Sequence, residues 1–407
     1  MCAGLAGRVK NMNKTVCFII DTPILESYKS YYVLDAFKEN GYRIELIDVS
    51  PFLNKEAYKK VKKGLMDYEE NHIHLCKNYK ELFCVLDTLS EDTYVFDSTG
   101  WNLEHYPIYR YLSKRNIKYG YMILNSCYEV VAQGDGKNRV KEFIKNFSFK
   151  RLKNAVFVRL PKSMFLNQAC SFVINNSPDE IENYKKRFYC DEKTKFLVVH
   201  SNLYEEALSH KDDLRIVKNN YCVWLDTYLP YHPDLENRDG IVPEDYYLAL
   251  RKFFTWIQEN FNIEVVVAAH PRSDYELHSY AYEGFQVIKY NTCLLVRDAK
   301  FVISDISSSF LYSIVYKKPM VLIYQNLIER ELPSQRRFIN ALGNELGKQP
   351  INIEELDYED KHLLDGILTI DKELYQKSAE SYIKQGFDGT ISGDSYKKII
   401  VDFLEES

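Results

Sequence analysis

The sequence contains no apolar run approaching the roughly 20 residues needed to cross a bilayer. Its opening stretch, MCAGLAGRVKNMNK, also lacks the apolar core of a signal peptide, so we expect a cytoplasmic protein whose fold begins near Lys14. Basic residues are not in excess, since 53 Lys and Arg stand against 58 Asp and Glu for a net charge of -5. This balance argues against a nucleic-acid partner, which would require a basic surface. Peripheral contact with the cytoplasmic face of the inner membrane stays open as an alternative.

Paired cysteine motifs are also missing. The nine cysteines are scattered with no CxxC pair, and several lie in apolar runs. We interpret them as reduced core residues, because a structural zinc site or a disulfide framework would show characteristic spacings.

What the sequence does contain is a repeated alternation of β-rich runs and helical segments. A length of 407 residues favours two domains. The strand segments expected in the first half are 15–21, 42–50, 92–101, 117–129 and 169–178, with a helix over 30–41. The strand segments expected in the second half are 195–202, 219–230, 263–271, 285–290, 299–309 and 318–325, with a helix over 243–261.

This alternation predicts an α/β protein with two Rossmann-like, doubly wound parallel sheets. We expect an N-terminal domain over 14–190, a second domain over 191–373, and C-terminal helices over 374–407, with packing of those helices back on the first domain as an open possibility. In such sheets ligands bind at the carboxyl ends of the strands, so polar residues at those ends are the candidate site residues.

Four strands of the second half end in polar residues. His200 follows one strand, Asp226 and Thr227 follow another, and His270-Pro271-Arg272 follow a third. The fourth ends at Ser304-Asp305, before Ser307, Ser308 and Ser309. Because parallel neighbours converge at one edge of a sheet, these groups are expected to share a cleft.

The serine cluster and His270 together suit an anion. Serine is a favoured N-cap, and the free N–H groups of a helix start can bind phosphate. His270 is held beside a proline of fixed φ and would project a rigid imidazole. Arg272 is a further candidate, because a guanidinium pairs with phosphate or carboxylate. The alternatives are a plain helix cap for the serines, a strand-end histidine bonded to the backbone for His270, and a solvated side chain for Arg272.

The segments HPRSDY and SDISSSFLYSIVYKKP, about 35 residues apart, resemble the paired HP and SS motifs of GT-B glycosyltransferases that use CMP-activated 2-keto sugar acids. These are the bacterial sialyltransferases, polysialyltransferases and Kdo transferases. The resemblance covers about 195–324 and implies that His270, Ser307 and Ser308, with Ser309 as a further candidate, contact the CMP phosphate. It also implies two Rossmann-like domains facing across a cleft. Ala268-Ala269 stand where these families often have a basic residue before HP, and the acidic motif of classical sialyltransferases is missing.

A second segment, WLDTYLPYHPD, looks like the LD-x-YLP-x-HPD pattern of capsule and lipopolysaccharide transferases related to retaining β-Kdo enzymes. The resemblance implies that Asp226 attacks the anomeric carbon of the donor. A turn or N-cap aspartate is the alternative. In the first half, Asp97 and Glu129 follow strands and are candidates for general acid or base toward the acceptor, although a turn role is equally open for each.

From these residues we expect a metal-independent glycosyltransferase that transfers a sugar, most simply Kdo, from a CMP donor to a glycan or glycolipid of capsule or lipopolysaccharide. The CMP-sugar is a substrate, and no cofactor is expected. No acidic pair is placed to hold Mg²⁺, since KDDLR at 211–215 looks like a solvated turn. Two alternatives remain open: a CDP-glycerol or polyol-phosphate transferase of the teichoic-acid type, and a non-catalytic protein that binds a nucleotide or a sugar.

Overall fold

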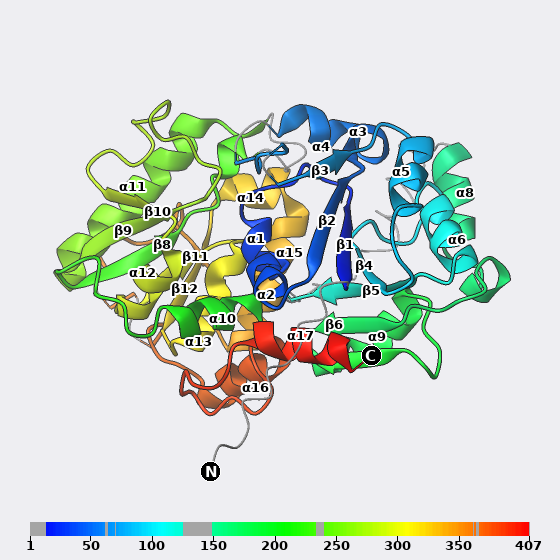
Figure 1. Cartoon of the computed structure of the whole chain (residues 1–407). Helices are drawn as coiled ribbons and strands as arrows, with labels where there is room; N and C mark the ends of the chain where they lie inside the picture. The colour runs from blue at the N-terminus through cyan, green and yellow to red at the C-terminus, as the bar shows by residue number, and fades with distance from the viewer. Residues whose placement is uncertain are drawn as a thin grey trace, which may run out of the picture. The chain divides into compact units, whose positions relative to one another are not determined.

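The computed structural model describes residues 14–61, 64–69, 71–124, 149–232, 240–360, 362–363 and 366–406. Within these ranges the chain forms two compact units (Figure 1). Unit 1 comprises 14–124, 149–199 and 394–406, and unit 2 comprises 200–393.

Unit 1 is built on a seven-stranded parallel sheet in the order β3-β2-β1-β4-β5-β6-β7. Its strands are β1 (Thr15–Ile20), β2 (Arg43–Asp48), β3 (Ile73–Leu75), β4 (Thr93–Asp97), β5 (Lys118–Ile123), β6 (Phe172–Asn175) and β7 (Lys195–Val198). Its α-helices are α1 (Tyr28–Tyr31), α2 (Leu34–Glu39), α3 (Ser50–Leu53), α4 (Lys55–Lys60), α5 (Tyr79–Leu86), α6 (Tyr106–Lys114), α8 (Phe149–Phe157), α9 (Ile181–Arg187) and α17 (Tyr396–Glu405). The single-turn helices η1 (Lys162–Met164) and η2 (Pro178–Glu180) complete it.

Both faces of this sheet are covered, as the alternation of side chains along β1 makes clear. Val16, Phe18 and Ile20 belong to one core, and Cys17 and Ile19 belong to another. Because successive strand residues point to opposite faces, the two cores lie on opposite sides of the sheet. Side chains of α2 and α17 fill the first core, and side chains of α5 and α6 fill the second.

Unit 2 carries a six-stranded parallel sheet in the order β10-β9-β8-β11-β12-β13. Its strands are β8 (Tyr221–Leu225), β9 (Glu264–Ala269), β10 (Gln286–Lys289), β11 (Val302–Ser304), β12 (Met320–Tyr324) and β13 (Ile351–Asn352). Its helices are α10 (Asn202–Ser209), α11 (Pro243–Phe261), α12 (Thr292–Asp298), α13 (Leu311–Val315), α14 (Asn326–Glu331), α15 (Pro333–Leu346) and α16 (Lys372–Tyr382), with the short helices η3 (Leu229–Tyr231) and η5 (Ser308–Phe310).

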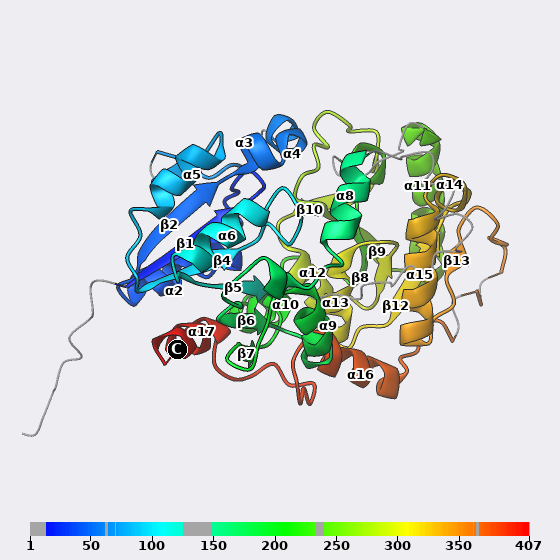
Figure 2. The same cartoon turned by 90° about the vertical axis from the view of Figure 1, so that its right-hand side faces the viewer.

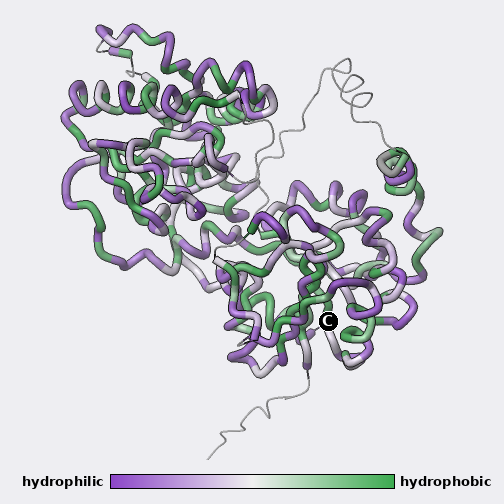
Figure 3. The backbone as a smooth tube through the Cα atoms, turned by 90° about the horizontal axis from the view of Figure 1, so that it is seen from above, coloured by the Kyte–Doolittle hydropathy of each residue, from purple (hydrophilic) through white to green (hydrophobic). Residues whose placement is uncertain are grey.

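Helices flank both faces of the unit 2 sheet, with α12 and α13 on one side and α11 on the other (Figure 2). Hydrophilic stretches of the chain lie on the outer helices and loops of each unit (Figure 3). The predicted architecture of two doubly wound α/β domains, as in the GT-B fold, is therefore confirmed.

Several predicted details were wrong. The strand expected to open the second domain is β7, which pairs in parallel with β6 and closes the sheet of unit 1. The chain accordingly enters unit 2 at His200, later than the expected boundary at 190. The C-terminal helices are present as expected; α16 belongs to unit 2, whereas α17 packs into unit 1, in line with the possibility left open above. The helix expected over 30–41 is broken into α1 and α2 at Val33, whose φ is +50°.

Candidate active site

Unit 2 contains a cavity of about 400 Å³ at the carboxyl ends of β8, β9 and β11. The chain runs from β8 outward to β10, and then from β11 outward to β13 on the other side. The β8–β11 pair is therefore the topological switch point, where α/β sheets bind ligands. The lining residues are Leu225, Asp226, Thr227, His232, Ala268, Ala269, His270, Pro271, Thr292, Ile306, Ser307, Ser308 and Ser309.

Asp226 directly follows the fully buried strand β8 and is itself buried. One carboxylate oxygen accepts from the backbone N–H of Tyr228 at 2.9 Å and the hydroxyl of Tyr282 at 2.9 Å. The other accepts from the backbone N–H of His270 at 3.0 Å and the hydroxyl of Tyr275 at 2.7 Å. Burial raises the pKa of Asp226, and these four hydrogen bonds oppose that shift. The carboxylate thus ties the end of β8 to the end of β9.

His270 projects at the end of β9 with one ring nitrogen already engaged. Its Nδ1 accepts a hydrogen bond from the backbone N–H of Arg272 at 3.1 Å. In the neutral imidazole the proton is therefore on Nε2, which makes that nitrogen a donor. His232, from the second His-Pro segment, meets this ring edge-on at 4.9 Å between centroids. Two imidazoles therefore contribute to one wall of the cavity.

The serine segment, Ser307 to Ser309, follows the carboxyl end of β11, which lies on the other side of β8 from β9. After β11 the chain turns through Asp305 and Ile306, and Ser307 is the N-cap of η5, which leads directly into α13. The Ser307 side chain makes no capping hydrogen bond. Ser307 and Ser309 are half-buried and Ser308 is exposed, and all three line the cavity. This arrangement presents hydroxyl and backbone N–H donors, as an anion site requires.

Asp305 lies buried at the switch point itself. It accepts a hydrogen bond from the Thr227 hydroxyl at 3.2 Å, which joins the ends of β8 and β11. Burial raises the pKa of Asp305 to about 7, the backbone N–H of Ile306 and the Thr227 hydroxyl lower it, and the charge of Asp226 raises it further. An acid that titrates near neutrality therefore stands beside two cavity-lining residues, Thr227 and Ile306.

The cavity brings together most of the residues predicted for phosphate binding, namely His270, Pro271, Ser307, Ser308 and Ser309, and the predicted nucleophile Asp226. Arg272 is exposed and does not line the cavity, although its backbone N–H orients His270. Glu129 lies outside the described residues.

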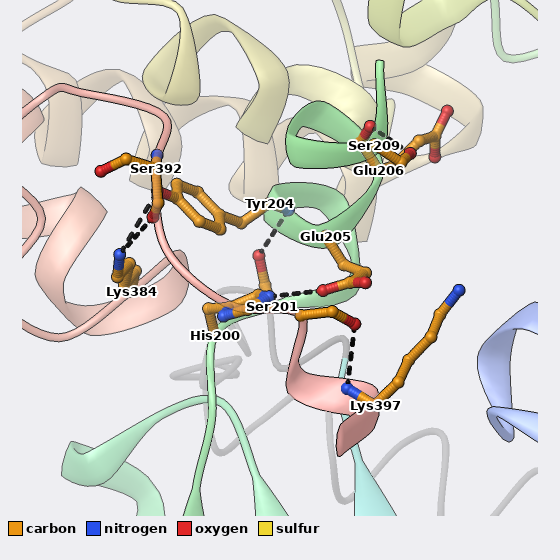
Figure 4. Close-up of polar contacts among 10 residues, drawn as sticks. His200, Ser201, Tyr204, Glu205, Glu206, Ser209, Lys384, Ser392 and Lys397 are labelled. Carbon is orange, nitrogen blue, oxygen red and sulfur yellow. Dashed lines mark hydrogen bonds and ion pairs between the residues drawn. The ribbon is translucent and has the colours of Figure 1, made fainter. Parts of the chain in front are cut away.

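His200 does not line this cavity. Its Nε2 lies 2.8 Å from the Glu205 carboxylate, and both side chains are almost fully buried. Figure 4 shows this pair beside Ser201, which caps α10 by accepting from the backbone N–H of Tyr204 at 3.2 Å. The imidazole of His200 therefore makes a buried structural contact with Glu205 at the start of α10.

Asp97 belongs to unit 1, at the end of β4. Its carboxylate accepts from the Thr99 backbone N–H at 3.2 Å, the Thr99 hydroxyl at 2.7 Å and the Tyr109 hydroxyl at 2.5 Å. Burial raises its pKa. These bonds match the turn role that the sequence left open.

Asp21, at the end of the adjacent strand β1, is a second acid of unit 1 with a raised pKa. Burial raises its pKa to about 6, His105 opposes the shift, and the charges of Asp97 and Asp48 add to it. The β1–β4 pair is the switch point of the unit 1 sheet, because strands are added outward from it in both directions. Asp21 thus occupies the ligand-binding position of that sheet.

Four residues of these two sites were given no role by sequence reasoning: His232, Thr292, Asp305 and Asp21. Asp305, Asp21 and His232 each sit at a visible strand end or in a His-Pro dipeptide, so the signal was present but shared with many turn residues. Thr292 begins α12 and carries no distinguishing pattern.

Within the described ranges, no group of three or more His, Cys, Asp or Glu side chains is arranged to hold a metal ion. No helix in the same part of the chain has the length and apolar character to span a bilayer.

No protein-family model matches the sequence, and no curated protein matches it. Among solved structures, the wall teichoic acid polymerase TagF (H548A) is 13% identical with a TM-score of 0.49, over 97% of this chain and 89% of that chain. The UDP complex of S. aureus MnaA is 12% identical with a TM-score of 0.49, over 96% of each chain. Acinetobacter baumannii MurG is 9% identical with a TM-score of 0.45, over 97% of this chain and 100% of that chain. Likenesses at this level carry no argument about activity or substrate.

Proposed function

We propose that this protein is a glycosyltransferase whose unit 2 cavity binds the phosphate of a CMP-activated 2-keto sugar acid, with Kdo as the sugar. The acceptor would be a glycan or glycolipid of capsule or lipopolysaccharide. The observation that carries the proposal is the convergence of His270, His232 and the serines 307–309 in one cavity at the switch point of a parallel sheet. The choice of CMP and Kdo rests on the sequence resemblance.

The chemistry of the lining supports a donor with a single phosphate. Among the described lining residues the polar groups are hydroxyls, imidazoles and one buried carboxylate, and none is lysine or arginine. The phosphodiester of a CMP-sugar carries one negative charge, which neutral N–H and O–H donors can satisfy. A nucleoside diphosphate carries more charge and would call for a cation. The same reasoning supports turnover without a metal.

During transfer the bond between the anomeric carbon and the phosphate oxygen breaks, and CMP leaves with an additional negative charge. Donors fixed around that phosphate stabilise the transition state more than the ground state. The Nε2–H of His270 is suited to this role, because the Arg272 backbone fixes the proton on that nitrogen. The serine hydroxyls and the N–H groups at the start of η5 are the other donors.

The geometry favours Asp226 as a positioning residue over a nucleophile. A carboxylate has about four lone-pair sites, and four donors already occupy them. Attack on the anomeric carbon would require one of these bonds to break. Instead, Asp226 accepts a hydrogen bond from the backbone N–H of His270 and so holds His270 in place. Transfer with retention of the anomeric configuration, through a covalent sugar adduct on Asp226, therefore remains a prediction from the resemblance alone.

For the general base toward the acceptor hydroxyl we propose Asp21 ahead of Asp97. A base works best when its pKa lies near the working pH, and the pKa of Asp21 is raised to about 6. Asp97 already accepts three hydrogen bonds. We further propose that the protein works in the cytoplasm, with peripheral membrane contact where the acceptor is a glycolipid.

The test is nucleotide binding followed by product analysis. Calorimetry should show CMP binding that weakens by about 1.5–3 kcal/mol in His270→Ala, the range for hydrogen bonds to charged groups. His210→Ala is the matched control, because this histidine of unit 2 pairs with Asp213 and does not line the cavity. Mass spectrometry of products from CMP-, CDP- and UDP-activated donors then identifies the reaction. Unchanged CMP affinity in a folded His270→Ala protein would remove the assignment, and turnover of CDP-glycerol alone would replace it with polyol-phosphate transfer.

A further inference from the structure

Tyr290 is not a lining residue of the unit 2 cavity but contacts one, Pro271, and it has an unusual combination of features. It joins β10 to the N-cap of α12, and the residue is 72% exposed. Its backbone φ is +67°, a region that bulky residues rarely occupy. An exposed tyrosine gains little from burial, so nothing in the packing of the fold accounts for this strain. Strained residues of this kind cluster at ligand sites.

The Tyr290 side chain is nevertheless held in a defined position. Its hydroxyl donates to the carbonyl of Pro271 at 3.4 Å, and Pro271 lines the cavity. Two residues after Tyr290, Thr292 lines the cavity as well. The Tyr290 side chain therefore reaches from the start of α12 to Pro271, in the loop that follows β9 (the β9 loop).

Lys289 supports the same ring. Its Nζ lies 5.0 Å from the ring centroid and donates to the carbonyl of Ser273 at 2.8 Å. A cation held near an aromatic ring in this way is itself a favourable contact. The lysine is thereby fixed to the β9 loop, and the aromatic surface beside it stays open to solvent.

We propose that Tyr290 is the platform on which the base of the bound nucleotide stacks. The inference rests on the proposed function, because it needs a nucleotide whose phosphate lies at His270 and the serine segment. A nucleoside that extends from that phosphate toward the rim formed by Pro271 and Thr292 meets the ring. Stacking suits a flat heterocycle and does not distinguish one base strongly from another. Tyr290 therefore contributes affinity for a nucleoside, and the choice among bases falls to other contacts.

The most informative variant is Tyr290→Gly. Glycine adopts positive φ without strain, so this protein should fold with a melting temperature at or above that of the wild type. Loss of the ring should weaken CMP binding about tenfold, within the range for base stacking on an aromatic side chain. Tyr290→Phe keeps the ring and should bind CMP within about twofold of the wild type. The control is Tyr58→Ala, which removes an exposed tyrosine of unit 1.

Ribose 5-phosphate separates stacking from an effect on the phosphate site. It has the sugar and phosphate but no base, so its affinity should be equal in the wild type and Tyr290→Gly. The inference would be overturned if Tyr290→Gly lost the same factor of affinity for CMP and for ribose 5-phosphate. It would also be overturned if Tyr290→Gly bound CMP as tightly as the wild type. If the wild type bound neither CMP nor any other nucleotide, the proposed function would fail, and the inference with it.

Discussion

Replacing Asp226 with asparagine should cost stability as well as activity, because every lone-pair direction of its carboxylate is used. An amide keeps one acceptor oxygen and puts an NH₂ donor where the other oxygen stood. That NH₂ faces one backbone N–H, of either Tyr228 or His270, and one tyrosine hydroxyl. The hydroxyl can rotate to accept, but the backbone N–H cannot.

The magnitude follows from these contacts. One buried N–H loses its partner, at a cost of about 1–3 kcal/mol. The remaining bonds change from charge-assisted to neutral, which removes about 1 kcal/mol each. The amide of Asp226→Asn is neutral, so the variant no longer has to bury a charge, and this offsets part of the loss. Burial of the charged form is unfavourable in the wild type, since it raises the pKa of Asp226. We expect a net loss of about 2–4 kcal/mol, a large part of the roughly 5–15 kcal/mol that stabilises a typical domain.

Urea unfolding followed by tryptophan fluorescence is the suitable assay. Trp224 is fully buried in unit 2, and its indole N–H donates to Tyr282 at 2.8 Å, so it reports the region around Asp226. Tyr275→Phe is the matched control, because it removes a single donor to the same carboxylate and should cost about 1–2 kcal/mol. An Asp226→Asn protein with wild-type stability and no turnover would refute this reasoning and restore the nucleophile.

Three further predictions concern catalysis and pH. Turnover should persist in excess EDTA, and a loss that Mg²⁺ or Mn²⁺ restores would show that a cation neutralises the phosphate. CMP affinity should fall about tenfold as pH rises from 6 to 8, because Asp305, with a pKa of about 7, gains a negative charge beside the cavity. Two like unit charges repel by about 4 kcal/mol at about 4 Å and an effective dielectric constant of about 20, and by about half as much at twice that distance. Asp305→Asn should lose that part of the pH dependence, while titration of the phosphate itself affects both proteins equally; identical profiles would contradict the role of Asp305. Turnover should fall as pH drops below about 6, since Asp21 must be ionised to accept a proton. Asp21→Asn should lose at least about 10²-fold in turnover with unchanged CMP affinity, and an active Asp21→Asn protein would exclude it as the base.

Local pattern was sufficient for most of the architecture. Buried strands such as β1 and β8 are short apolar runs between turn residues, and α11 begins at a proline followed by two acids. The pattern could not assign β7 to a sheet, because an apolar strand has the same appearance whichever neighbour it pairs with. The strands β3 and β13 are three and two residues long, too short to show an alternation.

The sequence by itself determined that the ends of β8, β9 and β11 would meet at the cavity of unit 2. His270, Asp226 and the serine segment each end a parallel strand, and parallel strands end at a common edge, so their convergence follows from chain order alone. Their roles were decided by tertiary structure. Asp226 became a fully bonded anchor because Tyr275 and Tyr282 reach it from about 50 residues away, and His200 was taken into a buried pair by Glu205. The chemistry of a carboxylate or an imidazole depends on the donors and charges around it, and only the folded chain brings those together.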